Sequence, residues 1–428
     1  GLASVAESKA CRLASHDLPI ADCAASGASC LEPRCCKTFG EQCFMKDFTS
    51  AHCKPTCRES DGWSCEKLGP RICPACMPVQ RTRPAVVIPT FERDLCKVVV
   101  MARSISKRDP HHLLGDVYLL WVSFEPAWKY KDQIDEARQA IEGAGVREFH
   151  LLDFSQQVKH MLCLYWSKDG STCMHSQTGW VVQEALKLKI ASVVHSEYYA
   201  VLDSKNAFMN DIQEDTFFGP CNQAKVTGQF RFDSMPMPHK QWYSKAAEIL
   251  RVEVNPDLYW PTSITPALLH RRTVIELLEQ IGEKPSPYSP CDGPLCKWFS
   301  MSATEFTLYH LFVAQRADRE CIHMFQRPGA EERPNEPMST VLWKGSGLKN
   351  NMETCLSVMQ GAVKPLTFGV QSGSLARKED DVEGQGEDAR MMMQRTKDCL
   401  THVYHHAGLL GSENTEAHNT SDFVSCVS

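Results

Sequence analysis

The chain has 428 residues, of which 43% are hydrophobic and 23% are charged, and its formal net charge is -6. This length predicts two or three folded units, and the ordinary composition is typical of a globular protein. The negative net charge argues against a nucleic-acid-binding protein that works through bulk positive charge. The sequence contains no apolar run of the roughly 18 residues that a membrane helix needs and no visible signal peptide, so we expect no transmembrane segment in this chain.

Cysteine usage is concentrated at the start of the chain. Eleven of the 21 cysteines lie within the first 76 residues. Small regions without a large core are commonly stabilised by disulfides, which form in oxidising compartments. Zinc is the alternative, because Cys53-x-x-x-Cys57 has ligand-like spacing. The adjacent pair Cys35-Cys36 does not fit paired zinc knuckles, so residues 1–80 are predicted to form a disulfide-stapled module.

Two further features bear on the compartment. The segment Asn419-Thr420-Ser421 is a glycosylation sequon. The odd cysteine total leaves at least one thiol free or paired between chains. Together with the expected disulfides, the sequon predicts a protein of the secretory pathway lumen or the extracellular space.

After the cysteine-rich module, residues 81–96 contain two prolines and are predicted to be a linker. Short apolar runs then alternate with helical patterns, one of which begins at a proline and ends at a glycine. The expected elements are strands at 97–105, 116–124, 146–154 and 198–202 and helices at 126–143 and 179–194. This alternation predicts an α/β domain whose mostly parallel sheet is flanked by helices.

The second half of this domain is less regular. The expected elements are helices at 241–254 and 302–317, a turn, short strand and helix within 259–282, and a closing strand at 364–373. The domain is therefore expected to span residues 97–375. Residues 376–428 are charged and poor in core residues, which predicts a disordered tail with one short helix near 391–403.

The stretch "YYAVLDSKNAF" reads as a buried strand with a polar end. Asp203 ends the apolar run, and Ser204, Lys205 and Asn206 follow it. In open α/β sheets, ligands bind beyond the carboxyl ends of the strands, so this end is a candidate binding site. An Asx turn, which aspartate forms without a ligand, explains the same residues equally well.

The helix expected before this strand favours a site. Gln183 and Lys187 are four residues apart, so they share one helical face. A lysine on such a face is most often only solvated. Next to a strand that ends in an acid, it could neutralise a phosphate as a point charge.

The block "GWVVQEALKLKIASVVHSEYYAVLDSKNAF" resembles a family of largely uncharacterised GT-A-like glycosyltransferase proteins. That family shows a Gly-Trp pair, a Gln-x-x-x-Lys helix and a Tyr-Tyr-x-x-Leu-Asp strand. The later blocks "PTSITPALLHRRTVIELLE" and "SATEFTLYHLF" also match, so the resemblance covers about residues 97–375. It implies a GT-A-like fold, a nucleotide-sugar donor, a glycan acceptor and transfer of the sugar between them.

The resemblance also implies a metal site, from which this sequence departs. GT-A strands end in Asp-x-Asp, whose acids hold Mn²⁺ or Mg²⁺ against the donor diphosphate. Asp203 matches the first acid, as a catalytic and metal-binding residue, but Lys205 replaces the second. Metal-assisted catalysis, catalysis in which Lys205 pairs with the diphosphate, and loss of activity all remain open. The alternative function is a non-catalytic, secreted carbohydrate-binding protein with a degenerate transferase-like domain.

The resemblance assigns further roles within the site. Glu305 would be the acceptor-side general base, although a capping box from Ser302 to Glu305 is the favoured explanation of that glutamate. Gln371 stands near the position where many GT-A proteins place a last histidine. The donor-binding residues implied are Gln183, Lys187, Ser204, Lys205, Asn206, Thr265 and His270, the last of which a surface histidine explains better.

The cysteine-rich segment is distantly similar to fungal-type cellulose-binding modules in "CCKTFGEQCFMKDFTSAHCKPTC" and "GWSCEKLGPR". Such modules bind flat glucans by stacking on coplanar aromatic rings. The similarity implies Phe44, Phe48 and Trp63 as stacking residues and a polysaccharide as partner. The spacing departs from the cellulose-binding pattern, and the same aromatics could instead fill a small core.

Overall fold

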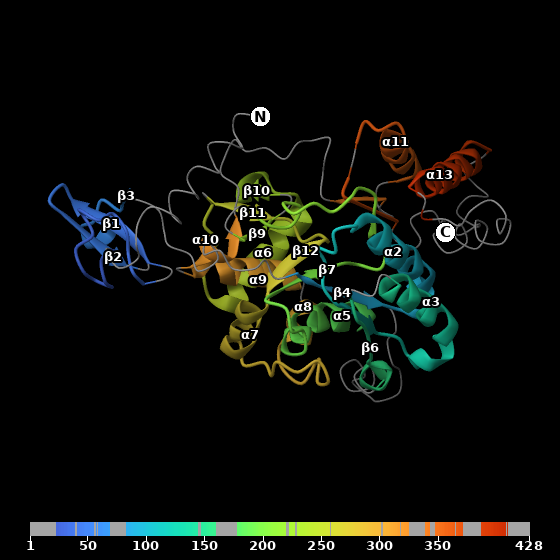
Figure 1. Ribbon diagram of the computed structural model, residues 1–428, viewed down its shortest axis with the longest axis horizontal. Helices are drawn as coiled ribbons and strands as arrows, with labels where there is room; N and C mark the ends of the chain where they lie inside the picture. The colour runs from blue at the N-terminus through green and yellow to red at the C-terminus, as the bar shows by residue number, and fades with distance from the viewer. Residues whose placement is uncertain are drawn as a thin grey trace.

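The computed structural model describes residues 23–38, 41–54, 57, 59–68, 83–143, 147–159, 178–219, 222–226, 229–256, 258–300, 303–316, 318–324, 339–342, 347–363, 365–370, 387–407 and 409. Its centre is a five-stranded sheet in the order β12-β7-β4-β5-β6 (Figure 1). The strands are β4 (Ala85–Thr90), β5 (Val117–Trp121), β6 (Phe149–Asp153), β7 (Tyr198–Val201) and β12 (Ala267–His270). The first four are parallel, and β12 runs antiparallel to β7.

Two layers of helices cover the two faces of this sheet. Every residue of β4, β5 and β7 is buried, as expected for parallel strands covered on both faces. Alternate residues divide between two cores: Val87 and Tyr199 pack with α5, whereas Val86 and Tyr198 pack with α2. The layer with α5 (Thr178–Lys189) also contains α6 (Met237–Leu250), α7 (Arg271–Gln280), α8 (Leu295–Ser300) and α9 (Glu305–Gln315), and the other contains α2 (Leu95–Arg108) and α3 (Lys131–Glu142). The predicted α/β class with a mostly parallel sheet and flanking helices is confirmed.

The start of the domain differs from the prediction. Residues 97–105, expected as a strand, lie inside helix α2, and the expected linker 81–96 contains β4, the central strand of the sheet. The consecutive β-branched valines of α2 favour a strand locally. However, Val98 and Val99 are buried in the core with the sheet and α3, and Val100 is buried in a separate core with residues of the C-terminal part. Pro89 suggested a linker, although it sits near the end of β4 in register with Leu120. The domain therefore begins before residue 97.

Short elements complete the domain. Strand β10 (Gln229–Arg231) pairs with β11 (Tyr259–Pro261), and β9 (Ala224–Lys225) pairs with β13 (His323–Met324), which follows α10 (Arg319–Ile322). Helix α7 is followed by Gly282, whose φ of +77° lies in the left-handed region that favours glycine. This agrees with the helix stop predicted there.

The C-terminal part forms a further unit against α2. Strands β14 (Ser339–Leu342), β15 (Thr367–Val370) and β8 (Ala207–Phe208) form a sheet, so the predicted closing strand is present but lies outside the central sheet. Helix α13 (Glu387–His406) packs on α11 (Gly347–Met359), and a disulfide joins Cys355 to Cys399. The region expected to be a disordered tail therefore contains a long packed helix, because Leu400 and Val403 bury apolar surface that its charged flanks conceal.

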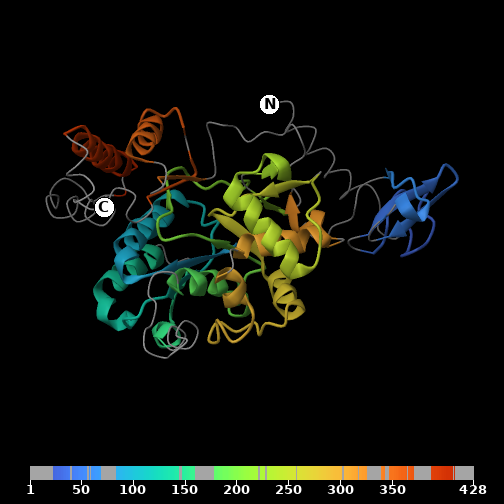
Figure 2. The same cartoon turned by 180° about the vertical axis from the view of Figure 1, so that it is seen from behind.

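The N-terminal module is a small disulfide-bonded sheet in the order β2-β1-β3. It consists of β1 (Gln42–Asp47), β2 (Ser50–Lys54) and β3 (Lys67–Leu68). The disulfides among its described residues are Cys23–Cys35, Cys30–Cys43, Cys36–Cys53 and Cys57–Cys65. Figure 2 shows this sheet and the α11–α13 pair at opposite ends of the molecule. Disulfides, rather than a zinc site using Cys53 and Cys57 together, hold the described part of the module.

The three aromatic residues expected to stack on glucans do not form one platform. Phe44 lies in β1 opposite His52 and is buried, with 6% of its surface exposed, so it does not offer a face for stacking. Phe48 is 93% exposed at the tip of the β1–β2 hairpin. The ammonium group of Lys54 lies 3.6 Å from the ring centroid of Trp63, so one face of that ring is covered.

Within the described ranges, none of the helices is both long and apolar enough to cross a bilayer.

Candidate functional site

A cavity of about 760 Å³ opens at the carboxyl edge of the central sheet. Taken in chain order, the parallel strands step from β4 through β5 to β6 on one side, and the chain then returns to place β7 on the other side of β4. The point between β4 and β7 is the topological switch point at which open α/β sheets bind ligands. Its lining residues come mainly from the β4–α2 connection, α5, the turn after β7, the segment before β12 and the start of α9.

Strand direction decides which predicted residues reach this cavity. Because β12 is antiparallel to β7, its beginning lies beside the carboxyl end of β7, and its last residue lies beside the beginning of β7. Thr265 precedes β12 and lines the cavity. His270 pairs with Tyr198, so it lies at the far edge of the sheet, with its ring Nδ1 2.7 Å from the Thr273 hydroxyl. The assignment of His270 to the donor site is wrong for this reason.

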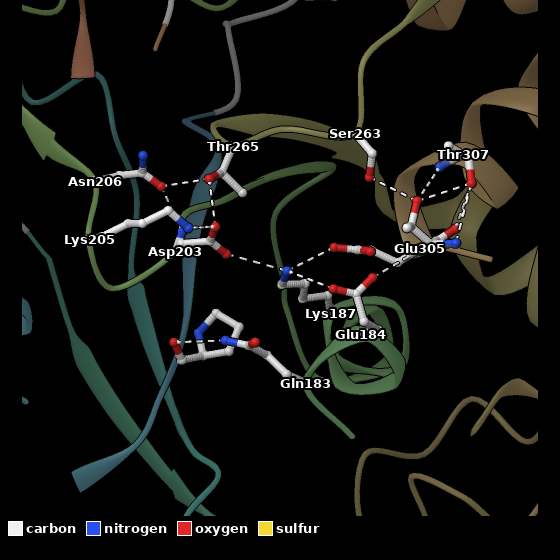
Figure 3. A network of polar contacts seen from close by, with 12 residues as sticks. Gln183, Glu184, Lys187, Asp203, Lys205, Asn206, Ser263, Thr265, Glu305 and Thr307 are labelled. Carbon is white, nitrogen blue, oxygen red and sulfur yellow. Dashed lines mark hydrogen bonds and ion pairs between the residues drawn. The ribbon is translucent and has the colours of Figure 1, made fainter. Parts of the chain in front are cut away.

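Lys187 is the centre of a buried ion cluster (Figure 3). Its ammonium nitrogen lies 2.8 Å from Glu305 Oε1, 3.5 Å from Glu184 Oε1 and 3.4 Å from Asp203 Oδ1. Asp203 lies on one side of the lysine, and the two glutamates lie on the other. Lys187 is 4% exposed, so the solvated lysine of an ordinary helix surface does not describe it. One cation therefore serves three carboxylates from three separate elements.

The cluster shifts the proton affinities of its members. Burial raises the pKa of Glu184 to about 7, and Lys187 only partly offsets this. Burial also opposes ionisation of Asp203, but the ammonium groups of Lys205 and Lys187 outweigh it and hold the pKa of Asp203 well below its usual range. Burial opposes the charge on Lys187, yet Glu184 and Asp203 raise its pKa above the ordinary lysine value. These shifts keep Asp203 ionised and Lys187 charged at neutral pH, and they place Glu184 near the middle of its titration.

The polar residues of the turn after β7 have two roles: some shape the turn, and others line the cavity. Asn206 Oδ1 accepts a hydrogen bond from the backbone N–H of Asp203 at 2.9 Å and lies 2.6 Å from the Thr265 hydroxyl. Asn206 is fully buried and does not line the cavity, so its side chain shapes the turn. Asp203, Ser204 and Lys205 do line the cavity. Of the predicted donor-binding residues in this turn, Asn206 is therefore structural.

Glu305 does not cap its own helix. Thr304 is the N-cap of α9 and forms a capping box with Thr307. Glu305 is the first residue of α9, is 1% exposed and pairs with Lys187. Its backbone N–H is 3.3 Å from Glu184 Oε2, so the two glutamates are joined through the backbone as well. The capping explanation favoured from the sequence is wrong, since a threonine one residue earlier fills that role.

Gln183 joins helix α5 to the sheet. Its side-chain Nε2 lies 3.5 Å from the carbonyl oxygen of Pro89 near the end of β4, and the residue lines the cavity. Four residues earlier, an added Cβ on Gly179 would lie 2.8 Å from the Phe91 ring, which shows how closely α5 approaches the segment after β4. Gln371, the residue noted near the end of the last predicted strand, lies outside the described residues.

Several residues of the cavity escaped the sequence analysis. Glu184 lies directly beside Gln183 and three residues before Lys187, a spacing that places it near that lysine on the helix. Four more follow β4, which the sequence analysis placed in a linker: Glu92, Arg93, Asp94 and Lys97. Two tryptophans, Trp180 and Trp242, also line the cavity.

The residues around Asp203 do not fit a divalent cation. Its Oδ1 faces Lys187, and its Oδ2 pairs with Lys205 and lies 3.1 Å from the Thr265 hydroxyl. Two unit charges about 4 Å apart interact by about 4 kcal/mol at an effective dielectric of about 20, so each ammonium would strongly repel a metal bound to this carboxylate. Lys205 occupies the sequence position where a second acid would be needed as a ligand.

The other carboxylates of the cavity are also engaged. Glu92 accepts a hydrogen bond from the Ser123 hydroxyl, and Asp94 pairs with Lys97 at 3.2 Å. Across the described ranges, one group of three potential metal-binding side chains has suitable spacing, and it consists of disulfide-bonded cysteines of the N-terminal module: Cys30, Cys36 and Cys53. Among the described residues that line the cavity, no three carboxylates therefore lie close enough together to hold one Mn²⁺ or Mg²⁺.

Comparisons with known proteins give a family and two distant structural likenesses. The family of unknown function DUF6492 matches residues 132–350, just over half of the chain. No curated protein matches this chain. The apo structure of the bifunctional glycosyltransferase WbbM is 8% identical, with a TM-score of 0.35, over 74% of this chain and 52% of that chain. The galactosyltransferase LgtC, in complex with donor and acceptor sugar analogs, is 10% identical, with a TM-score of 0.33, over 73% of this chain and 95% of that chain.

This chain thus spans about half the length of WbbM. At TM-scores below 0.5, neither likeness carries an argument about what this chain does. The fold class rests on the strand order and the two helical layers, and the site rests on the residues around the cavity.

Proposed function

The chain belongs to DUF6492, a family of unknown function, and from its site we propose that it transfers a sugar from a nucleotide-sugar donor to an acceptor hydroxyl. One observation carries the proposal. A single cavity at the topological switch point has cationic groups near Asp203 on one wall and two buried glutamates on another, with Lys187 between them. A sugar diphosphate has the matching character, because it joins an anionic group to a neutral ring with reactive hydroxyls.

The cationic wall suits the diphosphate of the donor. Arg93 is exposed beside the cavity, and Lys97 and Lys205 line it from the β4–α2 connection and the turn after β7. Burial lowers the pKa of Lys97, although its ion partner Asp94 opposes this, and the charge of Lys205 lowers it further. A phosphate bound on this wall would offset the repulsion between the two ammonium groups.

The carboxylate wall suits the acceptor. In the transfer, the acceptor oxygen forms a bond to the anomeric carbon while the bond from that carbon to the phosphate oxygen breaks. The electron pair leaves on the diphosphate, and the acceptor proton passes to a carboxylate. Glu305 and Glu184 are the candidates, and the pKa of Glu184 near 7 suits proton exchange at neutral pH. Asp203 would orient Lys187 and Lys205 between the two substrates.

The compartment is part of the proposal. Disulfides occur at both ends of the described chain, in the N-terminal module and between α11 and α13. Such bonds persist in oxidising compartments, which supports the secretory pathway lumen or the extracellular space.

The proposal is tested by screening UDP- and GDP-sugars for thermal stabilisation and for donor hydrolysis. We expect at least one donor to do both, and Asp203→Ala to reduce hydrolysis by about 10²-fold or more, as loss of a central electrostatic group does. Asp215→Ala is the matched control, because Asp215 is exposed and lies outside the cavity lining. Stabilisation without turnover would instead support a non-catalytic carbohydrate-binding protein. No response to any donor would refute both sugar transfer and nucleotide-sugar binding.

A further inference from the structure

We infer that the ammonium groups of Lys205 and Lys187 occupy the place of a divalent cation, so that this site binds the diphosphate of a nucleotide sugar without metal. The inference rests on the proposed function and adds how the donor's charge is offset. Its basis is the disagreement between the Asp-x-Asp pattern of metal-dependent sites and the contacts of Asp203.

The position of Lys205 is the first part of the argument. Lys205 follows Asp203 by two residues, and its ammonium group folds back onto Asp203 Oδ2. A metal held by Asp203 would need that oxygen or Oδ1, and Oδ1 faces Lys187 at 3.4 Å. Each oxygen of the Asp203 carboxylate therefore faces a lysine ammonium of the chain itself.

The ability of Lys205 to move is the second part. Its side chain is 16% exposed and lines the cavity, whereas that of Lys187 is 5% exposed. If Lys205 turns toward a phosphate, Asp203 keeps Lys187 and the Thr265 hydroxyl as partners. A lysine ammonium on a flexible four-carbon stem can make that change without moving the backbone. Asp203 would then hold Lys205 in readiness rather than bind a metal.

The same wall carries two further cationic side chains. Lys97 lies in the first turn of α2 and Arg93 just before that helix, and both line the cavity. Groups that stabilise a leaving diphosphate must be fixed near the phosphoryl oxygens, and positioned Lys and Arg side chains can take this role as a metal can. The carboxylates Glu92 and Asp94 on this wall already have Ser123 and Lys97 as partners.

The test is calorimetric titration of the full chain with UDP and GDP, once with EDTA and once with Mn²⁺. We expect one of these nucleotides to bind with a similar Kd in both conditions. Binding that occurs only with Mn²⁺, or that Mn²⁺ strengthens about tenfold or more, would overturn the inference while leaving the proposed function standing. If neither nucleotide bound in either condition, the proposed function and this inference would fail together.

Two substitutions of Lys205 sharpen the test. Lys205→Met keeps most of the side-chain length and should weaken nucleotide binding roughly 10- to 100-fold, with or without Mn²⁺, as expected for loss of a hydrogen bond to a charged group. Lys205→Asp replaces the ammonium with a carboxylate, so nucleotide binding in EDTA should fall further than in Lys205→Met. Lys131→Asp, on the exposed start of α3, makes the same charge change outside the cavity and should leave the Kd unchanged. Unaltered binding by Lys205→Met in EDTA would contradict the inference.

Discussion

Two buried lysines on the same helix, Lys187 and Lys189, differ in the number of carboxylates around them and in their access to the cavity. Lys189 is fully buried, pairs with Glu283 Oε2 at 2.7 Å and donates to the Ser289 carbonyl oxygen at 2.6 Å. Glu283 in turn accepts from the backbone N–H of Leu295 at 2.7 Å, which closes that site. Lys187 instead faces three carboxylates and borders a cavity. One lysine has matched partners and is structural, whereas the other has an excess of acidic partners and an opening for a ligand.

Replacing each lysine with methionine should give the largest difference between the two, measured as the loss of unfolding free energy. Lys189→Met would leave Glu283 buried without its ion partner, which should lower the free energy of unfolding by about 3–5 kcal/mol. Lys187→Met should cost less at pH 6, because Glu184 can hold a proton, Asp203 keeps Lys205, and Glu305, which also loses its partner, borders the cavity. Urea denaturation of both variants measures the difference. An equal or larger loss for Lys187→Met would break the distinction between a structural and a functional lysine.

The pH dependence of stability should reveal the acidic excess around Lys187. The pKa of Glu184 is about 7 in the folded chain, against the ordinary glutamate value of 4.5, so the folded state holds this proton more tightly. The stabilisation from that proton is complete below about pH 4.5 and is lost as pH rises through 7. Relative to Glu184→Gln, the wild type should lose up to about 3 kcal/mol of unfolding free energy over this range. A difference between the two proteins that stays constant with pH would contradict the assignment.

Two glycines allow a smaller test, because one lies beside the closed Lys189–Glu283 pair and the other lies beside the cavity. A Cβ on Gly293 would lie 2.4–2.5 Å from the carboxyl atoms of Glu283, which Lys189 and Leu295 hold in place. We expect Gly293→Ala to cost about 1–3 kcal/mol. A Cβ on Gly179 would meet the Phe91 ring, which borders the cavity and can turn into it.

Gly179→Ala should therefore change stability by less than about 1 kcal/mol, since alanine also favours the helix. Its effect should appear as weaker nucleotide binding, because the displaced ring narrows the cavity. Thermal melts and nucleotide titrations of both alanine variants check this pair. A greater loss of stability in Gly179→Ala than in Gly293→Ala would remove the contrast.

The sequence predicted much of the sheet, because β5, β6 and β7 are short apolar runs separated by clear helical patterns. It misplaced the first strand and helix of the domain. The valines of α2 and the proline of β4 have local preferences that tertiary packing overrides. That error hid Arg93 and Lys97, which follow β4 and line the cavity.

The site was partly predictable for a similar reason. Asp203 and Lys187 stand out because each has a recognisable place, at a strand end and on a helix face. The contact between Lys187 and Glu305 spans 118 residues, and no local pattern reports it. The edge strand β12 runs antiparallel, which brings Thr265 to the cavity and takes His270 away from it. Strand direction at a sheet edge cannot be read from alternation alone.

The shared position of Lys187 has a thermodynamic consequence. Its ammonium group contacts Asp203 on one side and Glu305 on the other, so both walls of the cavity draw on the same charge. A ligand that attracts Lys187 toward one wall weakens its hold on the opposite wall. Occupancy of the two walls is then linked by a coupling free energy, and by reciprocity each ligand changes the affinity of the other by the same factor.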